Sequence, residues 1–195
     1  DFFVDENVLD PRADSETLIQ AVLEKFPDKN QPIRILDLGT GSGCLLISLL
    51  MEYPNAMGIG VDISEKAIEI AQKNALKNGV KAEFILSDME KLPNNLGDFD
   101  IVISNPPYIP KKDIEGLDKN VREYDPILAL DGGVDGLDFY RIIADIAPAT
   151  TLFVEIGIGQ ESQVQEIFNN QNWHLWDAKK DFGGITRVLI FKKDL

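Results

Sequence analysis

Residues 105–108 read NPPY and combine side chains that could hold a planar polar group. Asn105 follows an apolar run and precedes Pro106, Pro107 and Tyr108. Proline fixes φ and cannot donate to a sheet ladder, so these residues end the expected strand abruptly. One interpretation is a plain turn. The other is a rigid claw, in which an amide oxygen, a fixed backbone carbonyl and an aromatic ring hold a substrate group.

A glycine-rich loop, DLGTGSGC, follows an earlier apolar run. Its glycines let the backbone turn tightly and approach a ligand closely, although a structural turn is the alternative interpretation. The spacing is G-x-G-x-G and not the dinucleotide pattern G-x-G-x-x-G. A pyrophosphate prefers bare backbone N–H groups at a helix N-terminus, whereas a carboxylate beside the loop suits a cationic ligand. We therefore expect S-adenosylmethionine, whose ammonium and sulfonium groups are positive, bound by Asp37, Gly39, Thr40, Gly41, Ser42 and Gly43.

Two further carboxylates follow apolar runs. Asp62 lies about as far beyond the glycines as the acid that binds both ribose hydroxyls in nucleoside-binding sheets. Capping of the next helix is the alternative for Asp62, but Ser64 already offers that cap. Asp88 could accept from an adenine amino group with Met89 against the ring, although ordinary packing would also explain Met89. The remaining expected cofactor-binding residues are thus Asp62, Ile63, Asp88, Met89 and Asn105.

The elements that must position these residues alternate along the chain. Helical spacing predicts helices at 15–26, 44–53, 65–78, 136–147 and 161–170, and apolar runs predict strands at 33–39, 56–63, 82–88, 99–105 and 151–157. Residues 173–181 and 186–193 should form two antiparallel strands at a sheet edge, and residues 111–131 a long functional loop. The alternation predicts an α/β fold, a doubly wound, mostly parallel seven-stranded sheet with an antiparallel C-terminal edge hairpin. Ligands of such sheets lie beyond the carboxyl ends of the strands, where all the groups above should meet.

Composition narrows the functional classes. The chain has 195 residues, 44% hydrophobic, which suits one domain with a full core. A net charge of -14 argues against tight nucleic-acid binding but leaves room for a basic protein partner. One Cys and one His argue against a disulfide and against a structural zinc site, so we expect no metal. No apolar run is long enough for a bilayer and no signal peptide is visible, which favours a cytoplasmic protein without membrane contact.

These motifs resemble those of a known enzyme family. DLGTGSG with VDIS is similar to the class I S-adenosylmethionine-dependent methyltransferases, which are Rossmann-like, and NPPY to their amino-methyltransferase signature. The segment VLDPRADSETLI, Val8–Ile19, resembles the PRPDTE element of the HemK-type protein-(glutamine-N5) methyltransferases. Arg122–Ile143 resembles their EP–AL–GG–DGL–YR element, and Asp181–Ile190 their closing hairpin. Two departures are Ala13 in place of proline and Asp10 in place of isoleucine.

The resemblance implies an activity and roles for the motif residues. It implies methyl transfer from S-adenosylmethionine to the glutamine N5 of the Gly-Gly-Gln motif in peptide chain release factors, leaving S-adenosyl-L-homocysteine. Asn105, Pro106 and Tyr108 would be catalytic, and with Pro107 they would bind the substrate. Alternatives are a ribosomal protein glutamine, an exocyclic amino group of adenine or guanine, or a non-catalytic binding module. The charge opposes the nucleic-acid alternative, and the intact motifs oppose the last.

The resemblance also implies a domain layout. Residues 1–30 would form a flank and a helix packed on a methyltransferase domain at 31–195, in a protein that we expect to be a monomer. The family's usual N-terminal helical domain, which helps to recognise the release factor, is absent from this chain. Because the sequence starts without methionine, we expect material before Asp1. Arg12 would approach cofactor or substrate carboxylates, with a surface salt bridge as the alternative, and Glu155 would line the substrate pocket or only cap the sheet.

Overall fold

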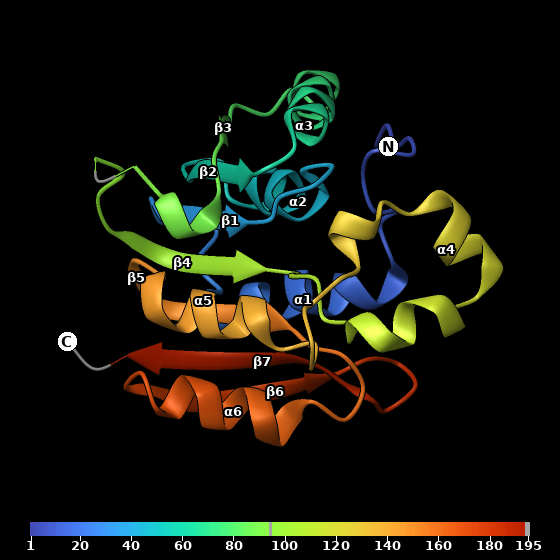
Figure 1. Cartoon of the computed structure of the whole chain (residues 1–195). Coiled ribbons are helices and arrows are strands. Elements are labelled where there is room, and N and C mark those ends of the chain that lie inside the picture. The colour runs from blue at the N-terminus through green and yellow to red at the C-terminus, as the bar shows by residue number, and fades with distance from the viewer. Residues whose placement is uncertain (94, 194–195) are drawn as a thin grey trace.

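A central sheet organises the part of the chain that the structure, a computed structural model, describes, residues 1–93 and 95–193. Seven strands form it there, in the order β3-β2-β1-β4-β5-β7-β6. The first five are parallel, and β7 is antiparallel to both of its neighbours (Figure 1). The strands are β1 (Arg34–Leu38), β2 (Met57–Asp62), β3 (Glu83–Leu86), β4 (Phe99–Ser104), β5 (Ala149–Glu155), β6 (Trp173–Lys180) and β7 (Thr186–Lys193). The predicted parallel sheet and its antiparallel edge hairpin are confirmed.

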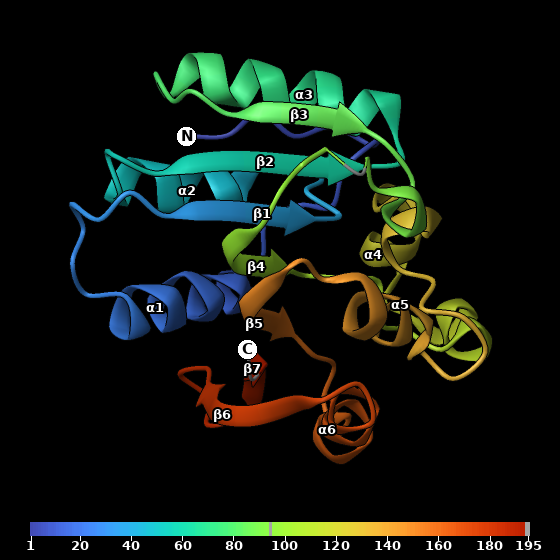
Figure 2. The same cartoon turned by 90° about the vertical axis from the view of Figure 1, so that its left-hand side faces the viewer.

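Helices cover both faces of this sheet (Figure 2). One face carries α1 (Glu16–Lys25), α2 (Cys44–Glu52) and α3 (Glu65–Lys77), and the other carries α5 (Asp138–Ile146) and α6 (Glu161–Asn169). Successive side chains of one strand point to opposite faces of the sheet. Ile35 packs in the core under α1 and α2, and Leu36 packs in the core under α5 and α6. Two apolar layers explain why the central strands are apolar almost throughout and not alternating.

Residues 111–131 are not the long loop that the sequence predicts. They contain three short helical elements, η3 (Lys111–Gly116), α4 (Lys119–Tyr124) and η4 (Ile127–Ala129). The segment is closed at its base, where Ile109 N donates to Leu130 O at 3.1 Å and Gly132 N donates to Ile109 O at 2.9 Å. Helices of one or two turns are too short to show a 3.6-residue apolar repeat, which is why the pattern gave no sign of them.

The helix ends agree with the sequence in part. Ser64 caps α3 by accepting from Ala67 N, as predicted, and Gly79 follows that helix with φ +67°. Ser15, directly before α1, makes no capping bond with its side chain. A 3-10 turn, η1 (Ala13–Ser15), leads into that helix instead. The Ser15 hydroxyl is therefore available for a contact elsewhere. No helix in the described ranges is long and apolar enough to cross a membrane.

Candidate active site

A cavity of about 300 Å³ opens beyond the carboxyl ends of the central strands. Its walls include the glycine loop after β1, the turns after β2 and β3, and part of the NPPY segment after β4. Residues 6–9, 11, 12 and 15 of the N-terminal segment and residues 126, 128, 129 and 139 contribute further parts of the walls. The volume is at the lower end of the range for ligand pockets, and the location is the one expected for ligands of a doubly wound sheet.

The glycine loop is held in a tight curve against β2. Gly39 N and Thr40 N both donate to Val61 O at 2.9 Å. Gly39, Gly41 and Gly43 have φ of +73°, +53° and +77°, conformations in which any other residue is strained. Gly43 also has no room for a side chain, because a Cβ there would lie 3.0 Å from Ile47. The sequence therefore needs glycine at these positions to make the tight turn that brings the backbone of the loop to the cavity.

Asp37 lies beneath this loop and not on the cavity wall. Its carboxyl group is only 1% exposed, and its Oδ2 accepts from the Thr40 hydroxyl at 2.7 Å. Its Oδ1 has no hydrogen-bond partner in the described part of the chain. Burial raises its pKa to about 7, opposed mainly by the hydrogen bond from Thr40. The structure thus shows Asp37 as a support for the loop, and its direct contact with a ligand stays a prediction.

Asp62 lines the cavity and also ties two turns together. Its Oδ2 accepts from Gly41 N and its Oδ1 from Ser64 N, each at 2.9 Å. Burial raises the pKa of this carboxyl group, and these backbone hydrogen bonds oppose the rise. Since a carboxylate oxygen can accept more than one hydrogen bond, each oxygen keeps capacity for a ligand hydroxyl. The capping and ligand interpretations of Asp62 are therefore compatible. Ile63, beside it, also lines the cavity.

The turn after β3 contributes an acid and a thioether. Asp88 and Met89 both line the cavity. Asp88 caps the short helix η2 (Met89–Lys91) by accepting from Glu90 N at 3.1 Å, and its side chain is partly exposed. Met89 packs against the core on the α5 side, and its Cε would lie 3.9 Å from a Cβ at Gly39. The methionine and the glycine loop thus face each other across one end of the cavity.

The NPPY segment reaches the cavity through two of its four residues. Asn105 and Pro107 line it, Pro106 is buried, and Tyr108 lies behind the wall, half-buried against the core. The Tyr108 carbonyl accepts from Gln160 Nε2 at 3.0 Å. Burial raises the pKa of the Tyr108 hydroxyl, with a smaller contribution from the charge of Glu155. The amide expected to hold a substrate group is therefore at the cavity, whereas the aromatic ring packs against the core, and the catalytic role of Tyr108 stays a prediction.

Further residues near the site include two, Ser15 and Gln160, whose contacts have no signal in the sequence. Asn105 Nδ2 donates to Ser15 Oγ at 3.1 Å, across 90 residues of chain. Glu155, at the end of β5, is buried behind this pair, and Gln160 joins Tyr108 to the turn after β5. Arg12 lines the cavity and also pairs with Asp125 at 2.5 Å, so both interpretations of Arg12 describe part of its position. Glu155 is expected from the sequence to line the substrate pocket or to cap the sheet, and it lies at the strand end without being part of the cavity wall.

Comparison with known proteins places the chain in a family. A model described as a methyltransferase domain matches residues 29–134. The release factor glutamine methyltransferase of Agrobacterium fabrum is 42% identical, over 99% of this chain and 70% of that protein. The one from Rhodospirillum rubrum is 41% identical, over 99% of this chain and 60% of that protein.

A solved structure shows the same fold. The magnesium protoporphyrin IX methyltransferase from Synechocystis PCC 6803 with bound SAM superposes with a TM-score of 0.61 at 20% identity. The match covers 92% of this chain and 79% of that one. At this identity the likeness concerns the fold alone, whereas the relatives above match closely over nearly all of the chain. The chain belongs to the release factor glutamine methyltransferase family.

Proposed function

We propose that this protein transfers a methyl group from S-adenosylmethionine to the side-chain amide nitrogen of the glutamine in the Gly-Gly-Gln motif of a peptide chain release factor. Family membership supports the reaction and the substrate. The observation that carries the proposal in the structure is the position of Asn105. Its side chain lines a cavity whose other walls are the glycine loop and two carboxylates. An amide acceptor is thus placed beside a site suited to a nucleoside.

The residues at the cavity fit the methyl donor. Positive-φ glycines bring the backbone to the cavity without side chains in between, and a side chain at Gly39 would approach Met89 Cε to 3.9 Å. Asp62 and Asp88 offer acceptors for ribose hydroxyls and for an adenine amino group. Acidic walls also favour a ligand that carries an ammonium and a sulfonium charge. S-adenosylmethionine, when bound, supplies an electrophilic methyl group.

The NPPY segment would activate the substrate amide. A primary amide nitrogen is a poor nucleophile, because its lone pair is delocalised into the carbonyl. Asn105 Oδ1 and the Pro106 carbonyl accept its two hydrogens, which raises electron density on nitrogen and stabilises the positive charge that develops there. Pro106 and Pro107 have fixed φ angles, so these acceptors need little reorganisation. Correct alignment of the nitrogen then supplies much of the rate acceleration.

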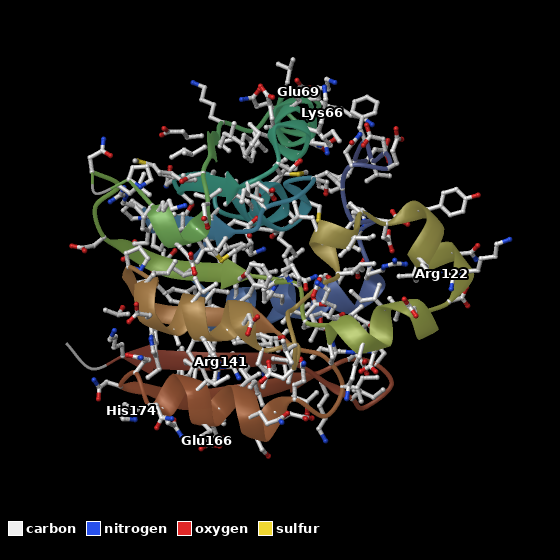
Figure 3. All side chains as sticks on the ribbon, in the orientation of Figure 1. Lys66, Glu69, Arg122, Arg141, Glu166 and His174 are labelled. Carbon is white, nitrogen blue, oxygen red and sulfur yellow. The ribbon has the colours of Figure 1, made fainter. Side chains whose placement is uncertain are left out.

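The reaction needs no strong general base. A methylated amide that is still protonated on nitrogen is a strong acid and releases its proton readily. His174 is on β6 opposite Lys192, at the end of the sheet away from the NPPY segment (Figure 3). The chain's one histidine is therefore not placed to remove that proton, and the proposed chemistry does not require it.

A labelling experiment tests the proposed function. The protein is incubated with methyl-labelled S-adenosylmethionine and a release factor, its Gln-to-Ala variant, a ribosomal protein mixture, or DNA. We expect label only on the intact release factor, with mass spectrometry locating the added methyl on the glutamine of the Gly-Gly-Gln motif. Label that persists on the Gln-to-Ala variant, or that appears on DNA or ribosomal protein alone, would contradict the proposal.

A further inference from the structure

Glu155 lies buried behind Asn105, and Ser15, which lines the cavity with Asn105, is buried beside it. In the parallel pair β4 and β5, Ser104 is opposite Val154, so the next residues, Asn105 and Glu155, are neighbours at the strand ends. Ser15 comes from the turn that leads into α1 and crosses these ends. Glu155 is 2% exposed and Ser15 6% exposed. The proposed reaction, as it stands, gives the Glu155 carboxyl group no task.

The three side chains are joined by hydrogen bonds. Asn105 Nδ2 donates to Ser15 Oγ at 3.1 Å. Hydrogen bonding from Ser15 and Asn105 also opposes the rise that burial causes in the pKa of the Glu155 carboxyl group, so both side chains lie beside it, while its Oε2 has no partner among the described residues. Because Oε2 faces no donor, we assign the contacts with Asn105 and Ser15 to the other oxygen of Glu155.

The direction of these hydrogen bonds is fixed by the chemistry of a carboxylate. An ionised carboxylate only accepts, so the Ser15 hydroxyl must donate its single hydrogen to Glu155. Ser15 Oγ then has only lone pairs for Asn105, which must present its NH2 group to both partners. Its Oδ1 consequently points the other way, toward the cavity that Asn105 lines. A reversed amide would set an NH2 group against the substrate NH2 group, and no hydrogen bond would form.

We propose that Glu155 and Ser15 are positioning residues, which fix the Asn105 amide with Oδ1 toward the substrate through the relay Glu155 carboxylate, Ser15 hydroxyl, Asn105 NH2. The proposal rests on the proposed function, since Oδ1 is the acceptor for the substrate amide. It assigns a role to a buried carboxyl group that touches neither substrate nor cofactor. If Glu155 were only structural, it would hold the strand ends together. It would not determine whether the oxygen or the NH2 group of Asn105 points toward the substrate.

The relay should depend on the ionisation of Glu155. A protonated carboxyl group can donate, which allows Ser15 to reverse and the Asn105 amide to turn. Burial raises the pKa of Glu155 to about 7, and hydrogen bonding from Ser15 and the charge of Arg187 oppose the rise. The other titratable groups that interact with Glu155 are Asp14 of η1, Tyr108, Cys44 at the start of α2, and Tyr140 of α5.

Nuclear magnetic resonance on the free protein tests the relay without substrate or cofactor. The Asn105 side-chain NH2 signals are assigned by their loss in Asn105→Ala. In the wild type we expect these signals to shift between about pH 5.5 and about pH 8.5, on either side of the raised pKa, and to exchange slowly with solvent. In Glu155→Gln the pH-dependent shift should disappear while the slow exchange is kept, because glutamine still accepts through Oε1. In Ser15→Ala the exchange should accelerate about tenfold or more, because the NH2 group loses a buried partner.

Kinetics then test the consequence of the relay for methyl transfer. Ser15→Ala should lower kcat by about 10- to 100-fold, the scale of a misplaced catalytic group, with KM for S-adenosylmethionine changed less than about twofold. Glu155→Gln should retain kcat within about fivefold at about pH 8 and lose the decline that the wild type shows toward about pH 6. Glu166→Gln is the matched control, since Glu166 is exposed on α6 and points away from the site (Figure 3).

The outcomes separate this proposal from the proposed function. The relay is overturned if the Asn105 NH2 signals of the wild type do not shift with pH. It is also overturned if a folded Ser15→Ala variant keeps full kcat, and in both cases release factor methylation still stands. A wild type that methylates no release factor overturns the proposed function, and the resonance experiment still decides whether the relay exists. Thermal unfolding of each variant identifies one that is merely unfolded, and in that case the milder Glu155→Gln change decides whether the relay operates.

Discussion

Asp37 and Glu155 each bury a carboxyl group near the end of a strand, beside the candidate site. Each has one oxygen without a hydrogen-bond partner in the described part of the chain. Burial raises the pKa of each to about 7, so near neutral pH these groups bind protons that an unfolded chain would release. Such groups cost stability when they ionise, which is expected where a fold keeps carboxyl groups for a site and not for its core.

The first prediction concerns the pH dependence of stability. Because the pKa of Asp37 is raised from 3.8 to about 7, its contribution to the free energy of unfolding is fully present below pH 3.8 and is lost as pH rises through 7. Asp37→Asn should therefore be more stable than the wild type at about pH 8, by up to about 4 kcal/mol, and the difference should shrink toward about pH 4. Urea unfolding at several pH values measures this. Asp113→Asn, at an exposed position, is the control, and a parallel pH profile for Asp37→Asn would contradict the prediction.

The second prediction concerns the acceptor itself. Asn105→Ala removes the proposed side-chain acceptor for the substrate amide and leaves the glycine loop and Asp62 in place. Loss of one preorganised hydrogen-bond partner at a developing charge typically costs about 100- to 1,000-fold in kcat. We expect a loss of this size, with the Kd for S-adenosylmethionine changed less than about threefold, because the reacting amide and not the cofactor loses its partner. Calorimetry and single-turnover methylation measure the two quantities, and undiminished turnover would refute the acceptor role.

At the scale of elements, a glycine turn and one glutamine hold the NPPY backbone in place. A Cβ at Gly132 would lie 2.8 Å from the Pro107 carbonyl oxygen, and one at Gly136 would lie 2.5 Å from the Tyr108 carbonyl oxygen. Gln160 donates to that same Tyr108 carbonyl at 3.0 Å and accepts from Gly157 N at 2.9 Å. The DGGVDG run thus permits a close approach of two backbones, and Gln160 links the segments after β4 and β5.

The third prediction tests this link. Gln160→Ala leaves the Tyr108 carbonyl and the Gly157 N–H without their side-chain partner, which should cost about 1–3 kcal/mol of unfolding free energy. Because the NPPY backbone is then less fixed, kcat should fall by about tenfold. Gln160→Glu keeps the acceptor but loses the donor to Tyr108, and should reproduce most of the kinetic loss. Gln163→Ala, exposed on α6, is the matched control, and a normal kcat in folded Gln160→Ala would show that the link does not position the NPPY backbone.

The sequence predicts those features that depend on local pattern. Apolar strands and the polar residues after them indicate the sheet and locate Asp62, Asp88 and Asn105, because carboxyl ends of parallel strands share one edge. The short helices at 111–131 are not predicted, because each buries too few apolar side chains to produce a 3.6-residue apolar repeat in the sequence. The position of Asp37 beneath the loop depends on its contact with Thr40, and the contact of Ser15 with Asn105 spans 90 residues. Tertiary contacts of this kind have no local signature.

At the scale of the whole molecule, the cavity is closed by segments distant in sequence. The N-terminal segment lies against α3, where Asn74 accepts from Phe3 N at 2.6 Å and donates to both Phe3 O and Ser42 O. Ser42 belongs to the glycine loop, so Asn74 ties the N-terminal segment to it. On the other side, Arg12 and Asp125 pair between this segment and the end of α4. Segments from the start and from the second half of the chain thus meet over one cavity.

The last prediction concerns this closure by Arg12 and Asp125. The pair joins two walls of the cavity: the Asp125 side chain is 6% exposed, and that of Arg12 is 43% exposed, so solvent screens the guanidinium, and an asparagine at 125 would still offer it an acceptor. Asp125→Asn should therefore leave the melting temperature of the free protein within about 2 °C and raise the Kd for S-adenosylmethionine about 3- to 10-fold. At a fixed, saturating cofactor concentration, a tenfold weaker Kd removes about 1.4 kcal/mol of the stabilisation by ligand. Calorimetry and thermal shift measure both effects.

The control for that experiment breaks an ion pair that does not connect two walls of the cavity. Glu69→Ala removes the partner of Lys66 on the exposed surface of α3 (Figure 3). It should change neither the Kd nor the thermal shift by the cofactor, because both side chains are well exposed and neither lines the cavity. Equal effects of Asp125→Asn and Glu69→Ala on the Kd would mean that charge alone, and not closure, tunes the affinity. An effect confined to Asp125→Asn means that the cofactor is held by a contact between chain segments that the sequence separates by more than half its length.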